Sequence, residues 1–349
     1  MIKYKKGMIA SLNLFFLLFV SRTIIGFTVS SEALKSRYSM DLVYSTFFAL
    51  LITFLISLPA VICAAKGKSV MNHRFLRVLY GVYFIFSGAV NVAKFAVFSS
   101  TELNQNAKIA VLAGFMILAC TYAASLGIEA VSRFGSMVFV ITLIGAVGVM
   151  AEGASDFSYL NLFPITQNPG ESVLRNILFS VCSTNELVLF IVLAPKVNGK
   201  TAKPFYFSLS AAYLVMMVLI AFTIGVLGDT ASLSAYPLFE VSQLSKLGSG
   251  ERLEAIFTAL WIFAVFLKIT LFLYCAGESF SFKKKWVKFS FCGAAMFALS
   301  AFFLYGSVFD SNQEKILYPA FAVFAFVLPL LYLIFGRKRN KIEEVNSHI

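Results

Sequence analysis

The sequence predicts an all-α integral membrane protein with ten transmembrane helices in a five-plus-five arrangement. Of its 349 residues, 59% are hydrophobic and only 13% are charged, whereas soluble chains average roughly 45–50% apolar and about 25% charged residues. The apolar residues form long runs that short basic segments separate. These observations exclude a water-soluble globular domain, and residues 1–349 are predicted to form a single membrane domain.

Each predicted span is an apolar run bounded by charges or turn signals, because a helix needs about 20 apolar residues to cross about 30 Å of hydrocarbon. The first run follows Lys3, Lys5 and Lys6, as a signal peptide would. It is longer than the roughly 7–15 residues of a signal-peptide core, so we interpret it as a span and not as a cleaved leader. The predicted spans cover residues 8–30, 42–65, 76–99, 107–124, 128–150, 174–195, 204–228, 253–276, 286–308 and 316–336.

Basic residues gather in alternate segments between the spans, and this pattern sets the predicted orientation because Lys and Arg are retained on the cytoplasmic side. With the N-terminus inside, the inner segments hold 19 basic residues and the outer segments hold 7. Both termini are then cytoplasmic, with residues 337–349 as a tail. The inner residues are Lys3, Lys5, Lys6, Lys66, Lys68, Arg74, Arg77, Arg133, Lys196, Lys200, Lys203, Lys283, Lys284, Lys285, Lys288, Arg337, Lys338, Arg339 and Lys341, and the outer ones are Lys35, Arg37, Lys108, Arg175, Lys246, Arg252 and Lys315.

Two outer segments, residues 151–173 and 229–252, are longer than the others and mix aromatic with polar residues. This composition predicts short amphipathic helices or turns at the outer interface, which act either as lids or as simple covering loops. The first of them divides the spans into residues 8–150 and 174–336. Because each half crosses the membrane an odd number of times, the two halves are predicted to form an inverted repeat.

Four ionisable residues lie inside predicted spans: Arg22, Lys94, Glu186 and Lys268. A charge that faces lipid at mid-depth costs at least about 2.5–3.5 kcal/mol, so these side chains are expected to face the interior of the bundle. For Arg22 and Lys94 the alternative is that they extend to the headgroups. For Glu186 the alternatives are a buried salt bridge and a neutral, protonated carboxyl group.

Polar residues interrupt the first and sixth spans, which hold equivalent positions in the two halves. In the first span they lie between Ser21 and Gly26, and in the sixth between Ser180 and Glu186. Paired interruptions of this kind predict broken helices and a ligand site at the midplane, because freed helix ends offer amides and carbonyls to a small molecule. The alternative is that the hydroxyls bond back to the preceding turn. The candidate ligand-binding residues, including polar positions on the third and eighth spans, are Ser21, Arg22, Thr23, Gly26, Asn91, Ser183, Thr184, Asn185, Glu186, Trp261 and Lys268.

The sequence offers no set of residues for enzyme or metal chemistry. Its five cysteines lie within apolar runs without CxxC spacing, and its two histidines, His73 and His348, lie in polar stretches. We therefore expect no catalytic residues, no metal and no cofactor. The net charge of +12 resides in short loops, so a lipid bilayer and not a nucleic acid is the expected partner.

A motif around the eighth span is the most specific in the chain. A Tyr-Pro pair precedes this span, Arg-Leu-Glu enters it, and a tryptophan and a lysine follow within it. This pattern resembles the spore germination permease family, the B subunits of GerA-type germinant receptors. The residues that carry the likeness are Tyr236, Pro237, Arg252, Leu253, Glu254, Trp261 and Lys268, together with Leu162 to Pro164, Glu186, Pro195 and Glu129 to Arg133.

The first two spans depart from the family pattern. The proline expected after the first helix is missing, Asp41-Leu-Val stands where Asp-Ala-Trp is usual, and Asn185 stands where a glycine often precedes the glutamate. The resemblance implies a LeuT-like fold of the amino acid–polyamine–organocation superfamily, with ligand between the broken first and sixth helices and the third and eighth. It also implies assembly with a germinant receptor A subunit and a lipoprotein C subunit in the inner membrane of the spore.

Three functions follow as hypotheses. The first is a receptor subunit that binds a small nutrient, an amino acid in the leading interpretation, and signals germination to its partner subunits. The second is a secondary transporter of an amino acid or organic cation coupled to H⁺ or Na⁺, in which Glu186 and Lys268 are the coupling groups. The third is a scaffold whose pocket has decayed.

Overall fold

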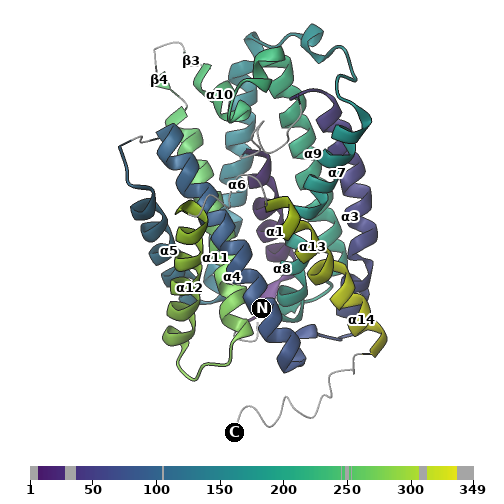
Figure 1. Cartoon of the computed structure of the whole chain (residues 1–349), viewed down its shortest axis with the longest axis vertical. Coiled ribbons are helices and arrows are strands. Elements are labelled where there is room, and N and C mark those ends of the chain that lie inside the picture. Colours follow the sequence, from purple (N-terminus) through teal and green to yellow (C-terminus); the bar gives the residue numbers. More distant parts are fainter. Residues whose placement is uncertain are drawn as a thin grey trace, which may run out of the picture.

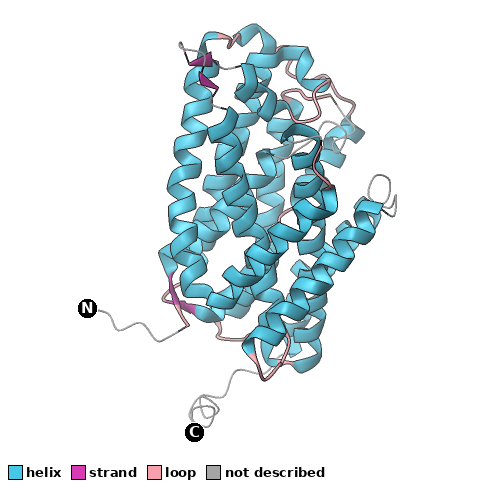
Figure 2. Ribbon diagram, turned by 90° about the vertical axis from the view of Figure 1, so that its left-hand side faces the viewer, coloured by secondary structure: helices cyan, strands magenta, loops and turns pink. Residues whose placement is uncertain are grey.

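Helices make up nearly all of the computed structural model, which describes residues 7–27, 37–103, 106–244, 246–247, 251–252, 254–305 and 313–335. Long helices run side by side along the vertical axis of Figure 1. The short strands lie only at the two ends of the bundle, as the view in Figure 2 shows.

Within the described residues, nine helical segments are long and apolar enough to cross a membrane, and α1 is a shorter apolar helix. Together they correspond to the ten predicted spans. The sixth span consists of α7 and α8, and the tenth of α13 and α14 joined by a π turn at Val323–Val327. The helices of the spans are α1 (Ser11–Phe27), α3 (Asp41–Ala65), α4 (Arg74–Phe98), α5 (Ile109–Leu126), α6 (Ile128–Glu152), α7 (Gly170–Cys182), α8 (Glu186–Leu193), α9 (Ala202–Leu227), α11 (Glu254–Ser279), α12 (Lys285–Tyr305), α13 (Gln313–Ala322) and α14 (Leu328–Phe335).

The helices form two groups around α1, as Figure 1 shows. On one side α4 and α5 pack against α11 and α12, and on the other α3 packs against α7, α9 and α14. Helix α1 contacts α6, α9 and α11 and so joins the two groups. The predicted limits of the inverted repeat, residues 8–150 and 174–336, stay a prediction.

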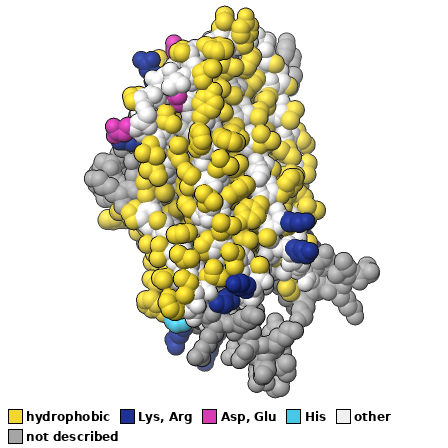
Figure 3. Space-filling model, turned by 90° about the vertical axis from the view of Figure 1, so that its right-hand side faces the viewer, with side chains coloured by type: hydrophobic (Ala, Val, Ile, Leu, Met, Phe, Trp, Pro, Cys, Tyr) yellow, Lys and Arg dark blue, Asp and Glu magenta, His cyan; other side chains and the backbone are white. Residues whose placement is uncertain are grey.

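The outer surface is apolar along most of its length, and Lys and Arg gather toward one end of the face in Figure 3. At that end β1 (Ile9–Ala10) pairs in parallel with β2 (Val197–Asn198). Nearby, Lys68 Nζ donates a hydrogen bond to the carbonyl of Leu333 at 2.8 Å. We call this the basic end, defined by Lys68, Lys196 and Lys288. The start of the first span and the ends of the sixth and tenth therefore lie on the same side of the bundle, as the predicted topology requires.

Short helices cover the opposite end, as predicted for the described parts of residues 151–173 and 229–252. Their place at the outer interface and their role as lids or covering loops stay predictions. The short helices are the 3-10 turns Gly153–Ser155, Tyr159–Leu162 and Gly228–Ser232 and the helix α10 (Pro237–Leu244), which the hairpin β3 (Lys246–Leu247) and β4 (Glu251–Arg252) follows. Phe239 of α10 is buried and packs edge-on against Phe98 of α4, with 5.2 Å between the ring centroids.

The sixth span is broken as predicted, but the first span is not broken between Ser21 and Gly26. Helix α1 continues through Phe27, and residues 28–36 lie outside the described residues. The polar side chains leave the backbone ladder of α1 intact because they bond elsewhere. The Thr23 hydroxyl donates to the carbonyl of Phe19, one turn back, at 2.9 Å, and Ser21 bonds to another helix. Hydroxyls that bond back in this way do not break a helix.

A charge cluster at the basic end joins the two helix groups. Glu278 of α11 accepts hydrogen bonds from Lys196, which follows the sixth span, and from Lys288 of α12 at 2.5 Å. The hydroxyl of Tyr274 accepts a further bond from Lys196 Nζ at 2.7 Å. Each of these charges is only partly exposed, so the cluster is less screened than a surface ion pair.

We expect Glu278→Gln to destabilise the protein by about 1 kcal/mol, because two partly buried lysines lose their shared carboxylate. Thermal unfolding of the purified protein in detergent measures this loss. The control is Glu171→Gln, since Glu171 is 87% exposed and its pairing with Arg175 spans 3.9 Å. Equal unfolding midpoints for the two variants would show that the cluster contributes nothing.

Candidate functional site

The break in the sixth span brings a helix N-terminus into the interior of the bundle. Helix α7 ends at Cys182 and α8 begins at Glu186. At the break the hydroxyls of Ser183 and Thr184 bond back to the carbonyls of Phe179 and Ser180, at 2.6 and 2.9 Å. Because the N-terminus of a helix carries a partial positive charge, it favours the carboxylate of Glu186 at this position.

Glu186 forms the centre of a buried polar cluster. Its Oε1 accepts hydrogen bonds from Lys268 Nζ of α11 at 3.1 Å and from the hydroxyl of Ser21 of α1 at 2.7 Å. Lys268 Nζ also donates to the carbonyl of Ser21 at 2.9 Å. The side chains of Glu186 and Lys268 are 0% and 2% exposed. Three predicted site residues therefore meet at one point, where the first, sixth and eighth spans converge.

The second carboxylate oxygen of Glu186, Oε2, is buried and has no hydrogen-bond partner among the described residues. A buried carboxylate oxygen without a partner is costly, because burial removes the water that would otherwise bond to it. The cluster therefore has capacity for one more donor next to the break.

Two tyrosines complete the surroundings of the break, and sequence reasoning missed both. The hydroxyl of Tyr83 on α4 donates to Asn185 Oδ1 at 2.5 Å, and the hydroxyls of Tyr213 on α9 and Thr184 lie 2.7 Å apart. Buried tyrosine hydroxyls need partners, and Tyr213 lies near the middle of the seventh predicted span. A tyrosine at that depth was the signal that could have identified it.

Arg22 is fully buried and makes its contacts with α7 and α9. Its Nη2 donates to the carbonyl and the hydroxyl of Ser180 at 3.1 and 3.0 Å, and its guanidinium carbon lies 4.3 Å from the ring centroid of Tyr213. It does not extend to the headgroups, which was the alternative for this residue. Lys94, the fourth ionisable residue of the spans, is half-buried on α4.

The remaining predicted site residues are engaged mainly with their own helices. Thr23 and Ser183 bond back to the preceding turn, Asn91 Nδ2 donates to the carbonyl of Ser87 at 2.7 Å, and Gly26 lies in the last turn of α1. These contacts match the alternative that the polar residues of a span bond to their own backbone.

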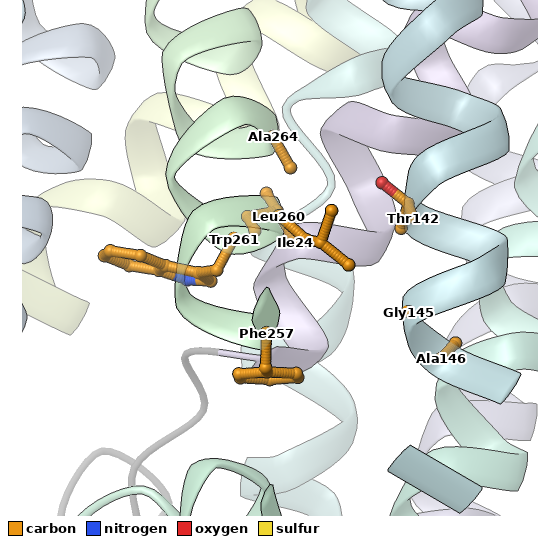
Figure 4. A pocket seen from close by; sticks show the side chains of 8 residues that line it. All are labelled: Ile24, Thr142, Gly145, Ala146, Phe257, Leu260, Trp261 and Ala264. Atoms are coloured by element: carbon orange, nitrogen blue, oxygen red, sulfur yellow. The ribbon is translucent and has the colours of Figure 1, made fainter. Parts of the chain in front are cut away.

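Trp261 lies apart from the ion pair, seven residues or about 10 Å along α11 from Lys268. Its ring packs against Phe95 and Phe98 of α4, with 5.7 and 4.2 Å between the ring centroids. In Figure 4 it points away from Thr142, on the opposite wall of a largely apolar pocket between α1, α6 and α11. That pocket is lined by Ile24, Thr142, Gly145, Ala146, Phe257, Leu260, Trp261 and Ala264.

Glu186→Gln and Lys268→Met are each expected to lower stability by about 3–5 kcal/mol, because each leaves a buried group without its partner. The double variant should lose less than the sum of the two, since neither charge is then left alone. Unfolding of the four proteins in detergent gives the coupling energy. The exposed pair Glu171 and Arg175 provides a matched control cycle, for which we expect almost no coupling. Additive losses at Glu186 and Lys268 would contradict an energetically coupled pair.

Comparison with solved structures identifies the fold. The chain is similar to a Na⁺-coupled sialic acid symporter in a substrate-bound, outward-open state, with a TM-score of 0.61 and 12% identity over 92% of this chain and 80% of that one. It is also similar to Mhp1, a nucleobase-cation-symport-1 family transporter in a closed conformation with bromovinylhydantoin bound. There the TM-score is 0.51 and the identity 11%, over 98% of this chain and 97% of that one. The chain therefore has the LeuT-like all-α fold of membrane transporters.

Comparison of the sequence with known families identifies its relatives. No curated protein matches the chain. The model of the spore germination protein family, the spore permeases, matches residues 67–315. This match includes the break in the sixth span, the eighth span with Lys268, and both long segments at the end opposite the basic end. It covers more than two thirds of the sequence, and the chain therefore belongs to the spore germination protein family.

Proposed function

We propose that this protein is the membrane subunit of a spore germinant receptor, which binds a small nutrient and signals germination to partner subunits. The nutrient class that we propose is the amino acids. Membership of the spore germination protein family and the LeuT-like fold support this function. One observation carries it: the buried cluster of Ser21, Glu186 and Lys268 at the break of the sixth span.

The cluster supports a signalling role because it connects three spans through a few hydrogen bonds. A nutrient with a donor for Glu186 Oε2 would add a partner at the break, and one that competes for Lys268 would loosen the contact between α8 and α11. Binding shifts a conformational equilibrium only when the ligand has different affinities for the two states. A site that lies between helices provides such a difference, since its dimensions depend on how the helices are placed.

The proposal also names the partner subunits, the location and the orientation of the protein. The partners are a receptor A subunit and a lipoprotein C subunit, and the location is the inner membrane of the spore, with both termini in the cytoplasm. The excess of Lys and Arg at the basic end supports that orientation. We also propose residues 8–150 and 174–336 as the two inverted repeats.

The second candidate is a secondary transporter of amino acids or organic cations coupled to H⁺ or Na⁺. It is favoured by the likeness to a structure described as a Na⁺-coupled symporter and to one described as a nucleobase-cation-symport-1 family transporter. The buried ion pair of Glu186 and Lys268 also favours it. The two functions use the same site and differ in whether the solute crosses the membrane.

We expect one class of solute to raise the unfolding midpoint of the purified protein in a panel of amino acids, nucleosides and sugars, because a ligand that binds only the folded state stabilises it. Amino acids are the class that we expect. Glu186→Gln should reduce the effect, and Lys108→Gln, an exposed change before α5, should leave it intact. An undiminished response in the Glu186 variant would remove this residue from the site.

For a receptor subunit, we expect no accumulation of the stabilising solute in proteoliposomes under an imposed H⁺ or Na⁺ gradient. A receptor needs only to bind, whereas a coupled transporter converts the gradient into uptake. The measurement is uptake of radiolabelled solute, and protein-free liposomes give the background. Gradient-driven uptake that Glu186→Gln abolishes would establish the transporter in place of the receptor.

A further inference from the structure

Arg22 is a buried cation whose hydrogen-bonding capacity is only partly used. A guanidinium group has five N–H donors. Nη2 bonds to Ser180, and the ring of Tyr213 faces the guanidinium carbon. The donors on Nε and Nη1 are buried and have no hydrogen-bond partner among the described residues. Three of the five donors are thus available to a ligand.

The charge of Arg22 lacks a counter-charge in the part of the chain that the structure describes. Its own contacts, to Ser180 and Tyr213, are neutral. The nearby carboxylate of Glu186 already binds Lys268, and Asp41 of α3 accepts hydrogen bonds from backbone amides of residues 167 and 168. A guanidinium stays charged at every pH that proteins meet, and an unpaired buried charge is costly. An anion beside Arg22 would remove this cost.

A pocket lies beside Arg22, between α1, α3, α7 and α9. Its cavity volume is about 30 Å³, room for a few water-sized groups. Arg22 and the residues Ser45, Thr46 and Ser180 give its lining a charged and hydroxyl-bearing part, and Leu42 and Phe179 belong to its apolar part. Pockets that bind small ligands combine an apolar lining with a few polar groups in this way.

We propose that this pocket, the Arg22 pocket, binds the carboxylate of a small monocarboxylate, with Arg22 as its charged anchor. The inference rests on the proposed function and names the chemical class of its ligand. Among the described residues that line the pocket, Arg22 is the one cation and the others are neutral, which favours a singly charged carboxylate over a phosphate dianion. The apolar lining fits a short aliphatic chain.

The Arg22 pocket is connected to the break of the sixth span through hydrogen bonds. Ser180, which holds Arg22, also accepts a bond at its carbonyl from Thr184, and Thr184 meets Tyr213 at 2.7 Å. Next to Arg22 in α1, Ser21 binds Glu186. A carboxylate that draws Arg22 away from Ser180 therefore alters contacts at both sides of the break.

The test is thermal unfolding of the full-length protein in detergent with propionate and with the neutral, similarly shaped propionamide, at constant ionic strength. We expect propionate to raise the midpoint in a saturable way and propionamide to leave it unchanged. Arg22→Gln should weaken the binding of propionate about 10- to 100-fold, because charge-assisted hydrogen bonds are lost. Ser45→Leu fills the pocket and keeps Arg22, and it should also abolish the response to propionate. This second variant keeps the test possible if the Arg22 variant does not fold. Lys108→Gln is the matched control, since it removes an exposed cation elsewhere.

Three outcomes would overturn the inference: equal effects of propionate and propionamide, a stronger effect of inorganic phosphate than of propionate, or an undiminished propionate response in both pocket variants. The nucleosides and sugars of the wider panel distinguish a failure of the carboxylate assignment from a failure of the proposed function. If they stabilise the protein and carboxylates do not, the nutrient site stands and the carboxylate assignment fails. If no solute of any class has an effect, both proposals fail.

Discussion

The rest of the structure depends on the pairing of Glu186 with Lys268 inside the bundle. Neither side chain is able to reach water, so each must find its partner within the protein, and the hydroxyl and carbonyl of Ser21 join the same cluster. This requirement fixes the position of α11 relative to α8 and places α1 between the two helix groups. It also explains why a carboxylate is tolerated at this depth, since the N-terminus of α8 and an ammonium group both stabilise it.

A broken helix inside a membrane leaves backbone groups without their usual partners, and polar side chains must satisfy them. Here the hydroxyls of Ser183 and Thr184 bond to carbonyls of α7. Tyrosines from helices on both sides bond to side chains at the break, Tyr83 of α4 to Asn185 and Tyr213 of α9 to Thr184. The break therefore belongs to both helix groups, and a movement of one group relative to the other changes its hydrogen bonds. Such an arrangement suits a protein that reports occupancy of a site, because binding and helix placement share the same contacts.

The ten spans and the break of the sixth were predictable because they depend on local composition: runs of apolar residues, and five polar residues within seven at the break. Glu186 stood out because a charge at mid-depth always needs an explanation. The continuity of α1 was not predictable, because Ser21 and Thr23 look alike in the sequence. In the structure Thr23 bonds to its own helix, whereas Ser21 bonds to Glu186. The pairing with Lys268 and the packing of Trp261 against α4 depend on contacts distant in sequence, which a single sequence does not reveal.

The separation of the paired residues along the chain has a consequence for biogenesis. Lys268 follows Glu186 by 82 residues. Strand β1 likewise pairs with β2 only after residues 197–198 have been made. When the sixth span leaves the ribosome, the ammonium group of Lys268 has not yet been made, so the Glu186 side chain has to be hydrated or protonated until the eighth span follows. The charge balance of the sixth span is therefore complete only after the eighth span has been made.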